Sequence, residues 1–217
     1  MRPPFSQVIY TIILCLCMHF LGHAQYSDYN RFSIDLQYGA SIPFSPDPGP
    51  GNYMQFKHVK TGVRYAFNPD VGARFFYSYN YFQDSGDEFS SIAHNQIGVD
   101  IVVNLSKAFV PKTAYDLSRN FRMMGHAGIG VSTARSQILL VTEYIGNLNV
   151  GLGPQFRIND NLSFFADGNF TFNFRQHLNY NSEKVRADGE FASGLVANLS
   201  FGLIFYLGQE DHHADWH

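Results

Sequence analysis

The sequence predicts an all-β fold, a transmembrane antiparallel up-and-down β-barrel of eight strands. Large apolar residues alternate with small or polar ones along segment after segment, most clearly over residues 195–207. Charged residues make up only 15% of the chain, against about 25% in soluble domains, while aromatic residues reach 16%. No apolar run after Leu21 is long enough for a membrane helix. A closed barrel is the remaining structure that satisfies its backbone in hydrocarbon.

The first 24 residues are expected to be a cleaved signal peptide rather than part of the fold. Arg2 gives a positive start, residues 8–21 are apolar but too short to span a bilayer, and Ala24 precedes the expected cleavage site. A retained membrane anchor is the alternative. Both cysteines of the chain lie in this segment, so we expect a mature protein without thiol chemistry or disulfides.

Eight strands are expected after the signal peptide, and each has one apolar face and one small or polar face. They cover residues 32–42, 58–67, 71–81, 96–105, 123–132, 147–158, 162–174 and 195–207. Eight is an even number, as in single-chain bacterial barrels. The predicted barrel domain therefore occupies residues 25–208.

The connections between these strands alternate in length. Tight turns are expected at residues 68–70 and 159–161. The long loops start near Pro43, Gln83, Thr133 and Arg175. An extension of the flanking strands through residues 138–144 is the alternative to the third loop. Outer-membrane barrels keep short turns in the periplasm and long loops outside, so both mature termini are expected to be periplasmic. Residues 106–120 are longer than such a turn and are expected to form a short helix or an irregular loop.

The inward faces of the strands carry charges of both signs. Because an eight-stranded barrel is filled by its own side chains, and because buried charges require partners, we expect a network of ion pairs in the lumen. Inward glycines would make room for its long side chains. The expected members are Asp35, Lys60, Arg64, Arg74, Asp100, Arg157 and Asp167. An ion gate or a small-conductance pore is the alternative interpretation.

Other chemistries have weak support in the sequence. His126 is the best-placed strand histidine, but its position predicts an inward side chain without a neighbouring serine, so we expect no enzyme. The tail from Asp211 to His217 contains three histidines and two aspartates. Short tails of this kind are usually solvated, so we expect no metal and no cofactor. No basic run is present to neutralise phosphates, which argues against nucleic acid as a partner.

The last strand also contains an assembly signal, formed by Ser200, Gly202, Phe205 and Leu207. Their spacing resembles the C-terminal strand that barrel-assembly machinery reads in bacterial outer-membrane proteins, a form of β-augmentation. A short periplasmic tail, residues 209–217, is expected to follow. Trp216 is expected to be exposed there and to anchor a partner, with contact to the membrane interface as the alternative.

Over its mature length the chain resembles the OmpA-type N-terminal barrel of Bacteroidota. Residues 124–132, 205–208 and 213–216 carry the resemblance. It implies an outer-membrane location and brings no catalytic residues. Longer relatives continue into a peptidoglycan-binding domain, whereas this sequence ends at His217. The link to the cell wall is therefore not expected here.

These observations together predict a non-enzymatic outer-membrane protein. We expect a structural or accessory subunit of an outer-membrane complex that serves secretion, uptake or barrel assembly. A free-standing barrel for envelope integrity or adhesion is the alternative. The expected partners are outer-membrane lipid and lipopolysaccharide, the barrel-assembly machinery during biogenesis, and other outer-membrane proteins.

Overall fold

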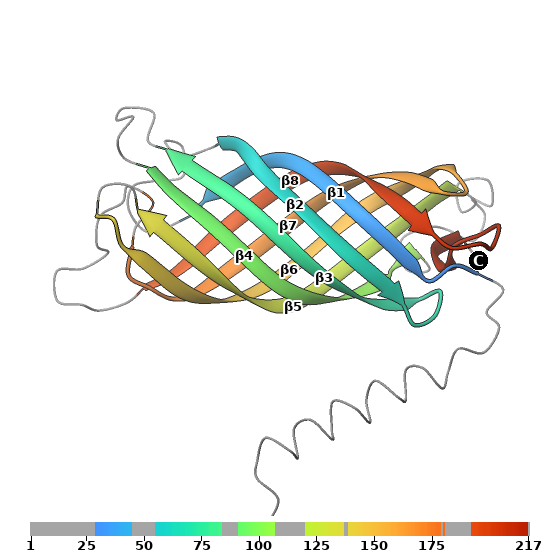
Figure 1. The fold of residues 1–217 in the computed structure, drawn as a ribbon, viewed down its shortest axis with the longest axis horizontal. Helices are drawn as coiled ribbons and strands as arrows, with labels where there is room; N and C mark the ends of the chain where they lie inside the picture. The colour runs from blue at the N-terminus through green and yellow to red at the C-terminus, as the bar shows by residue number, and fades with distance from the viewer. Residues whose placement is uncertain are drawn as a thin grey trace, which may run out of the picture.

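The computed structural model describes residues 29–44, 55–83, 91–106, 120–136, 139–178, 180 and 192–216. Within them, eight strands form one closed antiparallel barrel, in which each strand pairs with the next and β8 pairs with β1 (Figure 1). The strands are β1 (Phe32–Pro43), β2 (Gln55–Ala66), β3 (Val71–Gln83), β4 (Ser91–Asn104), β5 (Phe121–Ser136), β6 (Thr142–Asn159), β7 (Leu162–Gln176) and β8 (Ala192–Leu207). The predicted eight-stranded fold is confirmed. The predicted signal peptide lies outside the described residues.

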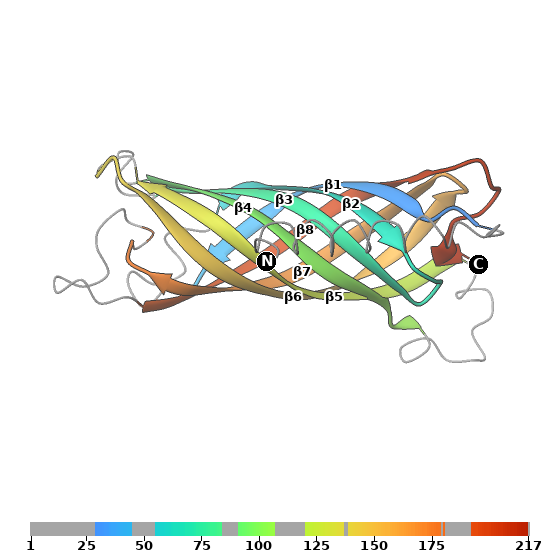
Figure 2. The same cartoon turned by 60° about the horizontal axis from the view of Figure 1, so that its bottom comes forward.

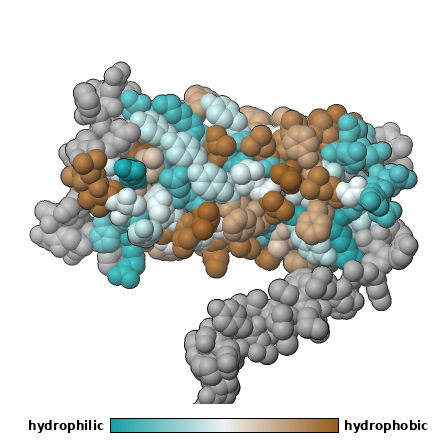
Figure 3. All heavy atoms as spheres, in the orientation of Figure 1, coloured by the Kyte–Doolittle hydropathy of each residue, from teal (hydrophilic) through white to brown (hydrophobic). Residues whose placement is uncertain are grey.

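The barrel wall is apolar outside and polar inside. In β1, Phe32, Ile34 and Leu36 are exposed, whereas Asp35 and Gln37 between them are buried. The same alternation runs through the other strands because successive side chains of a strand point to opposite faces. Figure 3 shows hydrophobic residues across the middle of one face of the barrel. Among the described residues no helix has both the length and the hydrophobicity needed to cross a membrane.

The barrel has two different mouths. Phe32 pairs with Leu207, so the start of β1 and the end of β8 lie at one end, which we call the terminal mouth. The tight turns between β2 and β3 and between β6 and β7 lie at this end as well. The connections after β1, β3, β5 and β7 lie at the opposite end, which we call the loop mouth. Most of the 106–120 connection lies outside the described residues.

The predicted long loop from Thr133 is wrong. β5 and β6 continue past the expected ends, with Thr133 paired to Tyr144 and Arg135 paired to Thr142. Figures 1 and 2 show this hairpin projecting beyond its neighbours at the loop mouth. The alternation of buried and exposed side chains persists through these residues. Only the outward residues change from apolar to polar, which made the strand ends resemble a loop in the sequence.

Candidate functional site

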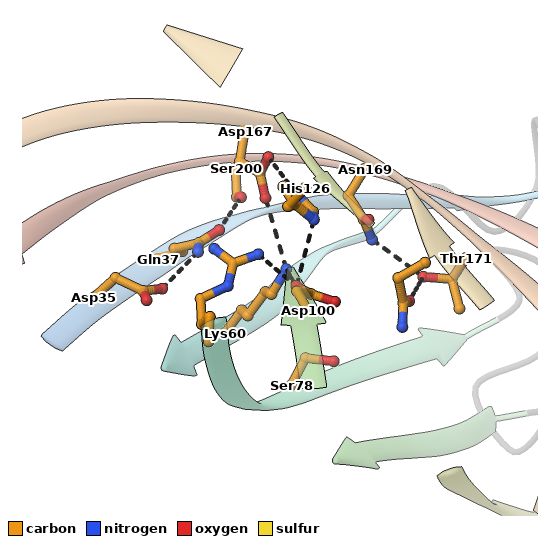
Figure 4. A network of polar contacts seen from close by, with 12 residues as sticks. Asp35, Gln37, Lys60, Ser78, Asp100, His126, Asp167, Asn169, Thr171 and Ser200 are labelled. Carbon is orange, nitrogen blue, oxygen red and sulfur yellow. Dashed lines mark hydrogen bonds and ion pairs between the residues drawn. The ribbon is translucent and has the colours of Figure 1, made fainter. Parts of the chain in front are cut away.

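A cluster of charged side chains fills the middle of the lumen, and Figure 4 shows it from close by. Arg74 Nη2 lies 2.7 Å from Asp100 Oδ2. Lys60 Nζ lies 3.9 Å from the same oxygen and 3.7 Å from Asp167 Oδ2. The His126 ring stands between the two carboxylates, with Nε2 at 2.9 Å from Asp167 and Nδ1 at 3.4 Å from Asp100. We call these five residues the central cluster.

The central cluster is almost completely buried, so its charges are stable only because they face one another. Asp35 adds a third carboxylate beside Arg74 and is itself held by Gln37, whose Nε2 donates to Asp35 Oδ1 at 2.7 Å. Lys60 and Arg74 supply the basic groups that face these carboxylates.

Two glycines make room for the largest members of the cluster. A Cβ atom at Gly62 would lie 3.0 Å from the Arg74 side chain and 2.7 Å from an Asp35 oxygen. One at Gly151 would lie 2.5 Å from His126 Nε2. Any larger residue at either position would displace the charged groups, so these small inward positions determine where the cluster can form.

Amide and hydroxyl groups continue the filling toward the loop mouth. Gln96 Nε2 and Thr171 Oγ1 both donate to Asn149 Oδ1, at 3.0 Å and 2.9 Å. Ser41 Oγ lies 2.6 Å from the side-chain oxygen of Asn198. Five of the eight strands contribute to these contacts, which bridge the lumen instead of lining a channel.

The loop mouth is closed by an apolar cluster inside the barrel. Leu178 and Tyr180 follow β7 and turn inward, and the Tyr180 ring packs edge-on against Phe82 with ring centres 4.9 Å apart. Glu143 holds this segment, because its carboxylate accepts from the backbone N–H of His177 at 2.6 Å and of Leu178 at 3.0 Å. The loop-mouth plug consists of Phe82, Ile92, Ala134, Ile145, Leu178, Tyr180 and Val196.

The terminal mouth is closed by the C-terminal tail, which turns back into the barrel end (Figure 2). A short 3-10 helix, Ala214–Trp216, places Asp215 against the Arg64 guanidinium. Arg122 Nε donates to the Asp215 carbonyl at 2.7 Å, and the Trp216 indole N–H donates to the Tyr206 hydroxyl at 3.0 Å. We call residues 209–216 the terminal cap.

Asp215 is ionised inside this cap. Its burial opposes ionisation, but the neighbouring Arg64 guanidinium and His213 hold the pKa of the carboxyl well below its usual value of 3.8. The cap is therefore fastened by a buried ion pair rather than by apolar contact alone.

The expectation of an exposed Trp216 is wrong. The side chain is only 8% exposed and packs with Phe165, Ile204 and Tyr206. Its ring also lies under the guanidinium of Arg122, 5.0 Å from the ring centre. A tail with apolar, aromatic and charged residues finds partners for all of them in the barrel end, so Trp216 is not available as an anchor for another protein.

The structure places the seven predicted network residues in three locations. Lys60, Arg74, Asp100 and Asp167 belong to the central cluster, with Asp35 beside it. Arg64 reaches the terminal cap instead. Arg157 does not join the network: it pairs with exposed Asp160 at the rim, because its position near the end of β6 lies beyond the filled lumen. The network prediction omitted His126, which lies at the centre of the cluster. Its place among the inward-facing residues of β5, visible from the alternation in the sequence, is the signal that could have found it.

The residues of the predicted assembly signal occupy both faces of β8. The Ser200 side chain points inward and its Oγ donates to Gln37 Oε1 at 2.8 Å. Phe205 and Leu207 are exposed on the outside. Gly202 sits at a close approach of strands, since a Cβ atom there would lie 2.3 Å from the Leu36 carbonyl oxygen. The residues of the signal therefore also serve the barrel itself: one bonds inside the lumen, two cover the outer wall, and the glycine allows the close approach of β1.

A small cavity separates the central cluster from the terminal cap. It has a volume of about 40 Å³ and is bordered by Asp35, Arg64, Arg74, His126 and Asp167, among others. This is room for a few water molecules in polar surroundings. Within the described residues no group of three or more His, Cys, Asp or Glu side chains could hold a metal ion. Side chains of the terminal cap, the central cluster and the loop-mouth plug fill the described lumen, an arrangement suited to hold the barrel shut.

Comparison with known proteins agrees with this fold. No protein-family model and no curated protein matches the sequence. The barrel is similar to Neisserial surface protein A, with a TM-score of 0.57 and 12% identity over 81% of this chain and 97% of that one. Ail, the attachment invasion locus protein of Yersinia pestis, gives a TM-score of 0.48 and 14% identity over 82% of this chain and 99% of that one. At 12% identity, the likeness to the Neisserial protein shows the fold.

Proposed function

We propose that the chain is a non-enzymatic outer-membrane β-barrel that acts through its outer surfaces as an accessory subunit of a membrane complex. The observation that carries the membrane placement is the inverted distribution of residues. Charges such as Lys60 and Asp100 are buried in the lumen, while Phe75, Ile129 and Phe201 are exposed around the wall. An outward apolar band around a polar interior is the pattern of a lipid-embedded barrel.

The closure of the lumen supports a role at the surface rather than transport. The terminal cap, the central cluster and the loop-mouth plug follow one another along the axis. A small-conductance pore would require all three to rearrange. In this proposal the terminal mouth faces the periplasm, the loop mouth faces the exterior, and residues 1–24 direct export before they are removed.

The projecting β5–β6 hairpin supports contact with a protein partner. Its tip exposes Leu139, Leu140 and Val141, and Leu140 is 79% exposed with a backbone φ of 51°. Tyr144, on the outer face of the hairpin, is 80% exposed. The φ of Leu140 is costly for a residue other than glycine. Exposed apolar groups at the end of a projecting hairpin suit insertion into a pocket of another protein. The partner would be another outer-membrane protein.

Purification from native membranes in mild detergent tests this proposal. Wild-type protein is expected to retain one or more outer-membrane proteins, and a variant with Leu139→Ser, Leu140→Ser and Val141→Ser is expected to lose them. Phe44→Ser is the matched control, because Phe44 is also an exposed apolar residue at the loop mouth but follows β1. A wild-type barrel that runs alone at every expression level would refute the subunit role and favour a free-standing barrel.

A further inference from the structure

The seam between the first and last strands is the contact that closes the barrel. β1 and β8 come from opposite ends of the chain, and they pair from Phe32 with Leu207 to Pro43 with Val196. Each of the other neighbouring strands follows its partner along the chain, whereas β1 and β8 are joined by their ladder and not by a connecting segment. A contact that bridges these two ends beyond the ladder therefore reinforces the closure itself.

Asn30 makes such a contact at the terminal mouth, just before β1 begins. The residue is buried, and all four of its polar groups bond to the terminal cap. Its backbone N–H donates to the His212 carbonyl at 2.7 Å, and its carbonyl accepts from the Ala214 N–H at 2.9 Å. Its side-chain Nδ2 donates to the Glu210 carbonyl at 2.6 Å, and its Oδ1 accepts from the Glu210 N–H at 3.0 Å. We call Asn30, Glu210, His212 and Ala214 the seam latch.

Gly208 turns the chain back toward Asn30 after the end of β8. Its φ of 150° is a conformation that residues with a side chain rarely adopt. A Cβ atom at this position would also lie 1.7 Å from Asn30 Oδ1. Beyond the turn, His213 forms a parallel bridge with Asn30, and Figure 1 shows the start of β1 beside the end of the chain. The residue that follows the last strand is therefore suited to form the latch.

The rest of the terminal cap ties the latch to strands on both sides of the seam. Asp215 pairs with Arg64 of β2 and accepts from Gln155 Nε2 of β6 at 3.1 Å. Trp216 donates to the Tyr206 hydroxyl of β8 at 3.0 Å. These groups surround the cap only when the barrel is closed. Opening of the seam would therefore separate the latch and these contacts together.

We propose that the seam latch forms last in folding and sets the lifetime of the closed barrel rather than the rate at which the barrel forms. Asn30 and Glu210 are 180 residues apart in the chain, and the pairing of β1 with β8 is what brings them together. Contacts that are absent from the folding transition state slow unfolding and leave the folding rate unchanged. The latch acts within the barrel itself, whether or not the barrel joins a larger complex.

Folding and unfolding rates of the purified protein in phospholipid vesicles test the proposal. Dilution out of urea or into urea starts each reaction, and the gel shift between folded and unfolded bands follows it. Asn30→Ala removes the two side-chain bonds of the latch. The variant is expected to unfold about tenfold faster than the wild type, because two buried hydrogen bonds are lost. Its folding rate is expected to stay within about twofold of the wild-type rate.

Deletion of residues 209–217 separates the latch from any other role of Asn30. The shortened chain is expected to unfold faster than the wild type, and Asn30→Ala is expected to change its unfolding rate by less than about twofold, because the partners of Asn30 are gone.

Asn68→Ala is the matched control at the same mouth. Asn68 Oδ1 also accepts two backbone N–H groups, those of Asp70 at 2.9 Å and Val71 at 2.8 Å, but both lie in its own turn between β2 and β3. Its effect is therefore expected to be the same in the full-length and shortened chains. An Asn30→Ala variant that folds more slowly, fails to fold, unfolds at the wild-type rate, or unfolds equally faster in both chains overturns the inference. A shortened chain as long-lived as the wild type overturns it as well.

Discussion

Asp100 is the single residue on which the central cluster depends most. Its side chain is 0% exposed and faces Arg74, Lys60 and His126 at once. We expect Asp100→Asn to lower the free energy of unfolding by about 3–5 kcal/mol, because it leaves buried cations without their counter-charge. Urea titration of the reconstituted barrel, read by the shift between folded and unfolded bands on a gel, measures this. Asp211→Asn removes an exposed charge and should change little; equal losses in the two variants would contradict the assignment.

At the same scale, the Asp215–Arg64 pair predicts how the terminal cap responds to pH. The pKa of Asp215 is lowered in the folded protein, so its charge stabilises the docked cap above the ordinary pKa of a carboxyl, and this contribution is lost as the pH falls further. Trp216 is the one tryptophan of the chain and reports docking directly. We expect acrylamide quenching of its fluorescence to be low and constant from pH 7 to about pH 5 and to rise below about pH 4.

The variant Asp215→Asn separates this effect from general acid unfolding. It removes the titrating group, so its Trp216 should be quenched more strongly already at pH 7. A wild-type profile that rises between pH 7 and pH 5 would show that another group controls the cap.

At the scale of single elements, two of the three glycines of β6 have opposite requirements. A Cβ atom at Gly153 would lie 1.8 Å from the Ala166 carbonyl oxygen of β7, whereas nothing lies within 4 Å of one at Gly146. We expect Gly153→Ala to cost about 1–3 kcal/mol, because the strands must move apart. Gly146→Ala should be neutral within about 0.5 kcal/mol. The same gel-shift titration compares them, and a similar cost for both would contradict the close packing of β6 on β7.

The register irregularity at the end of β7 explains how the loop-mouth plug forms. Arg175 has a φ of 60°, and the pairing with β8 shifts between Asn173 and Gln176. This local change directs the following residues into the barrel, where Glu143 accepts their backbone N–H groups. A strand that ended without the irregularity would continue along the wall and leave the mouth open.

For the whole molecule, the succession of cap, cluster and plug predicts a closed barrel. In planar bilayers we expect no stable single-channel steps from the wild-type protein. A variant that lacks residues 209–217 should also stay closed, since the loop-mouth plug and the central cluster do not depend on the tail. Regular conductance steps from the wild-type protein would instead support the pore alternative.

The sequence by itself determined the wall of this protein. Alternation with period two assigned each strand residue to the lumen or to the outside, which correctly placed Lys60, Arg74, Asp100 and Asp167 in the interior and gave eight strands. This works because the side-chain period of a strand is a local property of the backbone. It failed at the β5–β6 hairpin, where the outward residues leave the apolar band while the strands continue.

Only the tertiary structure decided which inward residues meet and what closes the ends. The partners in the central cluster come from β2, β3, β4, β5 and β7. The alternation along a strand shows which residues face inward, but not how far along the barrel axis each of them lies. The burial of Trp216 and the pairing of Asp215 with Arg64 depend on a tail folding back across the completed barrel. Such contacts exist only after the barrel closes, so the local pattern could predict a charged lumen but not its arrangement or its seals.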